Sequence, residues 1–161
     1  MPKNYEKRGF VDLDEIAYNV PSQKRMEARP VAIIECVQEI PCNPCVDACP
    51  TGAISMENLN AVPLLDAEKC IGCGQCMRVC PGLCIFLVHL TGETARVTLP
   101  YEMLPLPKIG EMVRTRGRDG SILGEGKVLR VETVGEEASS LVTLEVPREM
   151  AMHVRHFEVI V

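Results

Sequence analysis

Tryptophan is absent from this chain, and aromatic residues of any kind are scarce. The 161 residues contain only three Tyr and three Phe, so few large side chains are available for an extensive core. At this length the chain is near the usual size of one domain and can also hold two small ones. Something besides aromatic packing is therefore expected to help hold the fold together.

Long apolar runs and an excess of positive charge are also missing. The first residues, MPKNYEKRGF, lack the hydrophobic segment of a secretory signal, and no later run is long enough to cross a bilayer. We therefore expect a cytoplasmic protein with no membrane span. The 17 Lys and Arg against 22 Asp and Glu give a net charge of −5, which argues against general nucleic-acid binding.

Cysteine, by contrast, is abundant and confined to the middle of the chain. All nine cysteines lie between residues 36 and 84. In a reducing compartment, such closely spaced cysteines are typical of metal-binding thiolates rather than disulfides. We expect an N-terminal extension at 1–30, with one helical segment at 12–17, a cysteine-rich domain at 31–90, and a cysteine-free domain at 91–161 that docks a partner.

The cysteine-rich part contains an internal repeat. CNPCVDACPTGAI at 42–54 aligns with CGQCMRVCPGLCI at 73–85. Each copy lies between two apolar runs that predict strands and contains one helical turn, which Pro50 or Pro81 ends. Two such units can pack about a pseudo-twofold axis. The four predicted strands begin at Val31, Ala53, Val62 and Cys84.

The tail predicts a small antiparallel β domain. Residues 111–116, 127–134 and 141–146 alternate apolar and polar side chains, and the turn-like stretches GRDGS and VGEEASS separate them. Three prolines between residues 100 and 107 predict a linker ahead of these strands. We therefore expect a small antiparallel sheet of barrel-like form, which makes the whole chain α+β.

The second cysteine run has the complete spacing of a four-iron site. Cys70, Cys73, Cys76 and Cys80 are separated by two, two and three residues, and Pro81 follows the last of them. This is the bacterial spacing for [4Fe-4S] clusters, in which the fourth cysteine ligates the other cluster of a pair. Zinc sites use two separated cysteine pairs instead, so the spacing indicates an iron-sulfur cluster.

The first cysteine run departs from that spacing. Cys42, Cys45 and Cys49 match its last three positions, but Glu39 stands where the first cysteine belongs. Cys36 lies six residues before Cys42, and the longer loop that it requires costs little to close. Because thiolates hold nearly all [4Fe-4S] clusters, Cys36 is the preferred fourth ligand. Ligation by Glu39 and a three-iron cluster stay open as alternatives.

Residues 31–90 resemble a bacterial-type ferredoxin with two [4Fe-4S] clusters. The resemblance implies a ferredoxin-like fold with a pseudo-twofold repeat, in which the two motifs exchange their last cysteines. One cluster would then be held by Cys36, Cys42, Cys45 and Cys80. The other would be held by Cys49, Cys70, Cys73 and Cys76.

Two cysteine-saturated clusters leave no open metal position for a substrate. We therefore expect electron transfer and no catalysis by this chain alone. The combination of the IEC-x5-CNPC-x3-CP motif, the complete second motif and the β tail is similar to the small ferredoxin-like subunits of flavin-dependent proline and hydroxyproline dehydrogenases. That resemblance implies a flavoprotein partner, other redox subunits, and relay of single electrons to another carrier.

Other functions share these motifs. Hydrogenases, formate dehydrogenases and ketoacid oxidoreductases use similar modules, and a free-standing ferredoxin carrier needs only the cysteine-rich part. An iron-sulfur redox sensor or binding protein belongs to a different class, and the altered first motif is the feature in its favour. The lack of a basic, aromatic-rich surface counts against a nucleic-acid target for such a sensor.

The remaining candidates have plainer interpretations. Cys84 lies in the apolar run LCIFLV, where a cysteine behaves as a small hydrophobe. His153 and His156 are three residues apart without a cysteine or acidic partner at metal-binding spacing, and His89 has no constellation at all.

Three arginines of the tail alternate along one predicted strand. Alternation places side chains on one face of a strand, so we expect these arginines to share a solvated face. A docking surface for an acidic partner is the alternative. The three are Arg114, Arg116 and Arg118.

Overall fold

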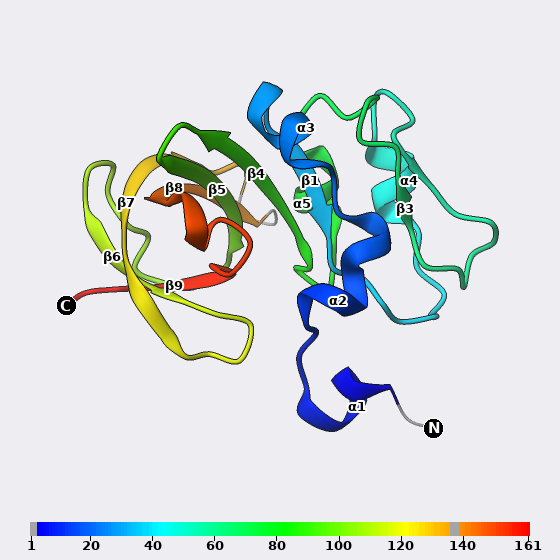
Figure 1. Cartoon of the computed structure of the whole chain (residues 1–161), viewed down its shortest axis with the longest axis horizontal. Helices are drawn as coiled ribbons and strands as arrows, with labels where there is room; N and C mark the ends of the chain where they lie inside the picture. The colour runs from blue at the N-terminus through cyan, green and yellow to red at the C-terminus, as the bar shows by residue number, and fades with distance from the viewer. Residues whose placement is uncertain (1–2, 136–138) are drawn as a thin grey trace.

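Two lobes lie side by side in the computed structural model, which describes residues 3–135 and 139–161 (Figure 1). One lobe consists of short helices and loops and contains every cysteine. The other is built from long, curved strands of the C-terminal half. The turn predicted from VGEEASS lies partly outside the described residues.

The first lobe is built from short elements. Its N-terminal part forms α1 (Asn4–Arg8), α2 (Leu13–Ile16), η1 (Ala17–Asn19) and α3 (Gln23–Ala28). Its cysteine-rich part forms β1 (Val31–Ile34), α4 (Pro44–Ala48), β2 (Ile54–Ser55), β3 (Leu64–Leu65), α5 (Gln75–Val79) and β4 (Ile85–Thr91). The predicted helical turns and flanking strands of the repeat are thus confirmed. Of the N-terminal helices only α2 is predicted, because α1 and α3 are too short and too polar to show a periodic pattern.

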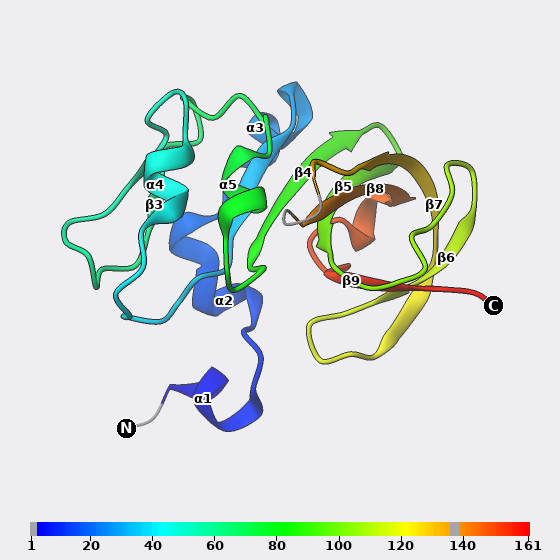
Figure 2. The same cartoon turned by 180° about the vertical axis from the view of Figure 1, so that it is seen from behind.

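The two copies of the repeat pair crosswise. β1, ahead of the first motif, pairs antiparallel with β4, which follows the second motif. β2, which follows the first motif, pairs with β3 ahead of the second. The helices α4 and α5 pack against each other (Figure 2), and they also contact β2 and β4 respectively. This exchange of strands is the pseudo-twofold arrangement that the repeat predicts.

The second lobe continues the same sheet. Its elements are β5 (Thr94–Tyr101), β6 (Met112–Arg116), β7 (Ile122–Glu132), β8 (Ser140–Pro147), η2 (Arg148–Met150) and β9 (His156–Val159). Together with β1 and β4 they form an antiparallel sheet in the order β1-β4-β5-β8-β7-β6-β9. The α+β class is therefore confirmed. The β4–β5 hairpin carries the sheet across the expected boundary between residues 90 and 91.

The barrel-like form of the tail is not confirmed, because the sheet does not close in the strand order of the described residues. It curves enough for Tyr101 at the end of β5 to stack on Phe157 of β9, with ring centroids 4.4 Å apart. The predicted proline linker is also wrong at its start, because Pro100 lies inside β5. β4 pairs with β5 only as far as Thr98, so Pro100 lies where β5 has a partner on one side only.

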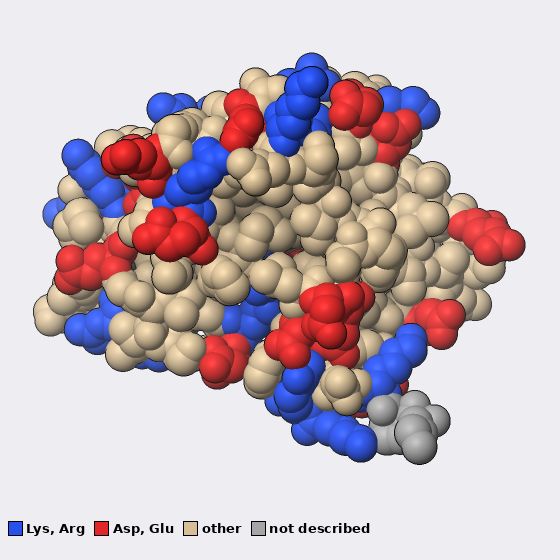
Figure 3. All heavy atoms as spheres, viewed as in Figure 1, with Lys and Arg blue, Asp and Glu red and all other residues tan. Residues whose placement is uncertain are grey.

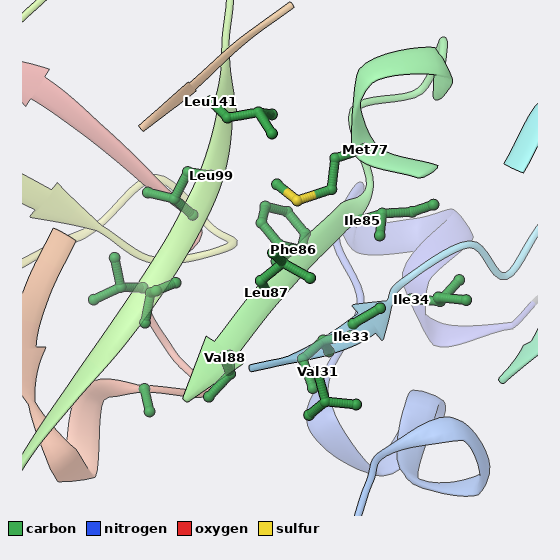
Figure 4. Packing of buried hydrophobic residues seen from close by; sticks show 14 of the residues in the cluster. Val31, Ile33, Ile34, Met77, Ile85, Phe86, Leu87, Val88, Leu99 and Leu141 are labelled. Atoms are coloured by element: carbon green, nitrogen blue, oxygen red, sulfur yellow. The ribbon is translucent and has the colours of Figure 1, made fainter. Parts of the chain in front are cut away.

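A row of apolar side chains crosses both lobes and joins their cores. Cross-strand pairing aligns one residue from each of five neighbouring strands, and all five are fully buried. Figure 4 shows the part of this core around β1 and β4. Because β4 belongs to both lobes, neither core is complete without the other. The row consists of Val31, Val88, Val97, Leu144 and Val128.

The surface shown in Figure 3 carries acidic and basic side chains that are interspersed. Within residues 3–135 and 139–161, no helix is both long and apolar enough to cross a bilayer.

Leu144→Ala tests the shared core. Leu144 is fully buried, so its truncation is expected to cost about 2–5 kcal/mol of unfolding free energy. Leu104, which is 85% exposed, gives the matched control, and Leu104→Ala is expected to change stability by less than about 0.5 kcal/mol. Anaerobic denaturant titration measures both, and equal effects would contradict a core that depends on this row.

Candidate functional site: two cysteine-lined cavities

Each predicted set of four cysteines surrounds its own cavity. The Cys73 cavity lies between β1, the first motif and the second cysteine loop. It is lined by Cys49, Cys70, Cys73 and Cys76, together with Ala32 and Leu87. The Cys36 cavity lies where both motifs meet the end of β1. It is lined by Cys36, Cys42, Cys45 and Cys80, together with Pro44 and Pro63. The crosswise packing of the two repeats thus brings each motif's last cysteine to the other motif's cavity.

The Cys36 cavity contains a fifth sulfur that the sequence interpretation treats as core packing. Cys84 lines it, and its Sγ is 3.6 Å from the Sγ of Cys80. The Cys84 thiol also lowers the pKa of Cys36 to about 7. Glu39 is exposed and does not line this cavity. Cys36 lines the cavity and Glu39 does not, so the geometry favours the Cys36 thiol over the Glu39 carboxylate as the fourth ligand.

The spacing of these side chains suits a cluster better than a single ion. In the described parts of the chain, no three His, Cys, Asp or Glu side chains gather closely enough to chelate one metal ion. A mononuclear zinc site needs four ligands converging on one point. Four thiols spread around a cavity match a polynuclear centre, whose irons each take one thiolate.

Backbone amides stabilise thiolate sulfurs at both cavities. The amide of Ala53 donates to the Sγ of Cys49 at 3.2 Å, and the amide of Ala32 donates to the Sγ of Cys70 at 3.4 Å. Hydrogen bonds from the Cys84 thiol, and then from backbone amides, lower the pKa of Cys80 to about 6 against the effect of burial. The thiolate is the form that binds iron, so these donors favour metal ligation.

The thiols of Cys45 and Cys76 lie where losing their protons is unfavourable unless a metal binds. Burial, and then the neighbouring sulfurs, raise the pKa of Cys45 to about 11 and that of Cys76 to about 12. For Cys45 the sulfur neighbours are those of Cys80, Cys36 and Cys42. Iron would compensate the crowded negative charge, so the donor sets fit two iron-sulfur clusters.

Two glycines shape the second cysteine loop. Gly72 and Gly74 have φ angles of +68° and +75°, in the left-handed region that glycine adopts without strain. A Cβ on Gly72 would lie 2.6 Å from the carbonyl oxygen of Pro30. The loop between Cys70 and Cys76 can therefore lie directly against the chain that enters β1.

The N-terminal extension holds the start of that loop. Arg25 of α3 is 5% exposed and donates from Nη2 to the carbonyl of Cys70 at 2.7 Å, and from Nε to the carbonyl of Ala67 at 2.7 Å. Asn19 donates to the carbonyl of Pro63 at 3.0 Å. These side chains satisfy buried backbone carbonyls and so fix the loop that leads into the second motif.

The tail holds the end of β1 through a buried ion cluster. Glu35 is 8% exposed, and its carboxylate accepts from Arg118 Nη2 at 2.5 Å and from Arg155 Nε at 2.6 Å. Burial lowers the pKa of Arg155 to about 10, and the charge of Glu35 opposes that shift. The guanidinium of Arg155 also lies 4.9 Å from the ring centre of Phe86. We call Glu35, Arg118 and Arg155 the buried ion cluster.

Glu35 and Cys36 are consecutive, so they point to opposite sides of the extended chain. The side chain of Glu35 enters the tail lobe, and that of Cys36 lines the Cys36 cavity. The amide of Glu35 also donates to the carbonyl of Cys84 at 2.9 Å, which extends the β1–β4 pairing. The buried ion cluster therefore fixes the backbone from which Cys36 projects.

The prediction for the three arginines holds for only two of them. Arg114 and Arg116 of β6 both bind Glu158 of β9, at 2.7 Å each. Arg118 lies beyond the end of β6 in the turn and belongs to the buried ion cluster, so its predicted solvated position is wrong. A turn breaks the alternation on which the prediction depends.

The histidines lie apart from the cysteine cavities. His156 is half-buried on β9, its ring centroid is 6.1 Å from that of Tyr101, and burial lowers its pKa. His153 lies in the preceding turn and is exposed. His89 lines a cleft beside Cys73.

Residues 35–84 match the family model described as a 4Fe-4S dicluster domain, so this segment belongs to that family. The segment holds two [4Fe-4S] clusters, as the resemblance to ferredoxins predicts. No solved structure matches the chain.

Named relatives are similar to parts of this chain. The polyferredoxin-like subunit of aliphatic sulfonate oxidoreductase from Pyrococcus furiosus is 49% identical over 47 residues, which are 29% of this chain and 27% of that protein. An uncharacterized ferredoxin from Methanocaldococcus jannaschii is 31% identical over 81 residues, half of each chain. The thiosulfate reductase electron transfer subunit PhsB of Salmonella typhi is 43% identical over 49 residues, 30% of this chain and 25% of that subunit. The chain thus spans at most half the length of these relatives.

Glu35→Ala tests the buried ion cluster. The substitution leaves Arg155 buried without its counter-ion, and a lost buried partner is expected to cost about 3–5 kcal/mol of unfolding free energy. Glu158 is a matched control because it also binds two arginines, but at the surface. Glu158→Ala is expected to leave the denaturation midpoint nearly unchanged. Equal midpoints for both variants would show that the buried ion cluster does not stabilise the fold.

Gly72→Ala tests the close approach of the second cysteine loop to Pro30. Gly92 has a similar φ of +72°, but no atom lies within 4 Å of the place where a Cβ would sit, so Gly92→Ala carries the backbone strain alone. The steric contact at Gly72 is expected to cost about 1–3 kcal/mol more than the control. The midpoint for loss of visible cluster absorbance in denaturant measures this difference, which vanishes if the loop can move away from Pro30.

Proposed function

We propose that this chain is an electron-transfer iron-sulfur subunit of a multisubunit oxidoreductase in the cytoplasm. The observation that carries the proposal is the pair of cavities, each surrounded by four cysteines within one small lobe. A bound [4Fe-4S] cluster takes up and releases one electron at a time. Two clusters in one lobe suit a relay of single electrons between a donor and an acceptor.

The proposed ligands follow from the cavities. Cys49, Cys70, Cys73 and Cys76 hold one cluster, and Cys36, Cys42, Cys45 and Cys80 hold the other. Cys84 stays a thiol in this proposal and donates hydrogen bonds to the sulfurs of Cys36 and Cys80.

The proposed donor is a flavoprotein subunit. Its support is the motif resemblance to subunits of flavin-dependent amino-acid dehydrogenases, in which a two-electron oxidation must be divided into single-electron steps. Two of the three named relatives belong to sulfonate and thiosulfate enzymes, so the substrate of the host enzyme is the less constrained part of the proposal. A free-standing carrier would not require the two flanking segments, which contact Cys70 through Arg25 and the end of β1 through the buried ion cluster.

Iron analysis tests the ligand assignment. Two clusters of four irons give eight irons per wild-type chain after anaerobic purification. Cys36→Ser is expected to lose irons from the Cys36 cavity only. Cys84→Ala and Glu39→Gln are matched controls beside Cys36 and are expected to keep the full iron content. Loss of iron in Glu39→Gln with retention in Cys36→Ser would reverse the assignment.

Affinity purification of the tagged chain from its native host tests the relay. A stoichiometric flavoprotein in the purified complex is the expected result. Recovery of the fully loaded chain without any redox partner would contradict the subunit proposal and favour a free carrier.

A further inference from the structure

A cleft of about 530 Å³ lies where the second cysteine loop meets the sheet of the second lobe. Pro30, Gly72 and Cys73 form its wall on the loop side, and residues of β4, β5, β7 and β8 form the other wall. Figure 2 shows α5 beside β4, at the boundary of the two lobes. The volume is within the range of ligand-binding clefts. We call this feature the docking cleft.

Cys73 gives the docking cleft access to a cluster. Among the nine cysteines it is the exposed one, while the others are buried or partly buried. The cluster that the proposed function assigns to the Cys73 cavity is therefore closest to solvent at this position. Electron exchange between proteins requires such a close approach to a partner's surface.

The sheet wall of the docking cleft is cationic. Arg96 and Arg130 are exposed and line it, and His89 is the cross-strand neighbour of Arg96. Glu132 is already bound by Arg130 at 2.9 Å and by Arg78 at 3.4 Å. Alternation places these side chains on the face opposite the buried apolar row.

Counted over the described residues 3–135 and 139–161, positive charge exceeds negative charge around the docking cleft, although the whole chain carries a net charge of −5. Among the residues that the structure describes, the acidic side chains beside the docking cleft are Glu132, which lines it, and Glu145, which is the cross-strand neighbour of Arg96 and Lys127. The basic side chains are Arg78, Arg96, Lys127 and Arg130. A cationic surface within an acidic chain is complementary to an acidic partner and repels a basic one.

We propose that the docking cleft receives an acidic one-electron carrier protein, with Arg96 and Arg130 as its specificity-determining side chains. The inference rests on the proposed function, because it names the partner class for the cluster at the Cys73 cavity. One electron passes between the chain and the carrier's redox centre, so one side is oxidised as the other is reduced. No bond is made or broken, and no proton is required.

The test uses the acidic carrier rubredoxin as the probe and the fully loaded chain as the receptor. Binding is followed under anaerobic conditions by calorimetry and by backbone chemical shifts of β7 and β8, at low and at physiological ionic strength. The expected result is salt-sensitive binding with shifts at the cleft residues 129–132 and 141–143. In Arg96→Gln/Arg130→Gln the affinity is expected to fall about tenfold or more.

Arg114→Gln/Arg116→Gln is the matched control. It also removes two positive charges from the second lobe, but from the arginines that bind Glu158 rather than from those of the docking cleft. Rubredoxin affinity is expected to stay near the wild-type value in this control. The basic carrier cytochrome c serves as the opposite probe, and its binding is expected not to weaken in the cleft variant.

Several results would overturn the inference. Equal loss of affinity in both double variants would show that net charge alone matters. Absence of salt-sensitive rubredoxin binding, or shifts confined to other strands, would show that the cleft does not receive the carrier. Chemical-shift changes at the cleft residues on addition of the small anion ferricyanide, with none on addition of rubredoxin, would show that the cleft is a small-anion site instead.

Iron content and paramagnetic resonance separate this inference from the proposed function. If the wild type and both variants contain two reducible clusters but rubredoxin does not bind, the docking inference alone fails. If the wild type lacks two reducible clusters, the relay itself fails. The rate at which the reduced chain reduces rubredoxin, measured by stopped flow, then checks that rubredoxin bound at the docking cleft exchanges electrons with the clusters.

Discussion

The contact between Glu35 and two arginines of the tail joins the two lobes directly beside a predicted cluster ligand, Cys36. Arg118 and Arg155 are 83 and 120 residues away from Glu35 in sequence, yet both bind its carboxylate in the interior. A buried carboxylate is stable only with such partners. The residue that follows it is Cys36, so the geometry of one cavity depends on how the tail folds.

The same dependence holds at the Cys73 cavity. Arg25 of the N-terminal extension binds the carbonyl of Cys70, and Gly72 lets the loop lie against Pro30. β4 pairs with β1 on one side and with β5 on the other, so one apolar row continues from lobe to lobe. The flanking segments thus stabilise the cysteine-rich part directly.

The cysteine repeat is predictable because its features are local. Spacing, the proline after each motif and the apolar runs on either side all act within a few residues, and they predict the loops, α4 and α5, whereas the exchange of the last cysteines comes from the resemblance to ferredoxins. The alternation in the tail likewise predicts β6, β7 and β8. The end of β5 could not be predicted, because a proline such as Pro100 normally argues against a strand. It is tolerated here because β4 does not pair with β5 beyond Thr98.

The buried charges could not be predicted in the same way. Charged side chains are almost always exposed, and neither Glu35 nor Arg155 has a local pattern that marks it as buried. Their pairing depends on tertiary contacts between distant segments. The role of Cys84 was also hidden, because an apolar run gives no sign that its thiol faces the sulfurs of Cys36 and Cys80.

Paramagnetic resonance of the fully reduced wild-type chain tests the central claim most directly, namely that two complete clusters lie close together in one lobe. Two unpaired spins per chain are expected, with a spectrum broadened by magnetic interaction between neighbouring [4Fe-4S] clusters. A single unperturbed spin per chain, or a three-iron signal in the untreated oxidised protein, would contradict it.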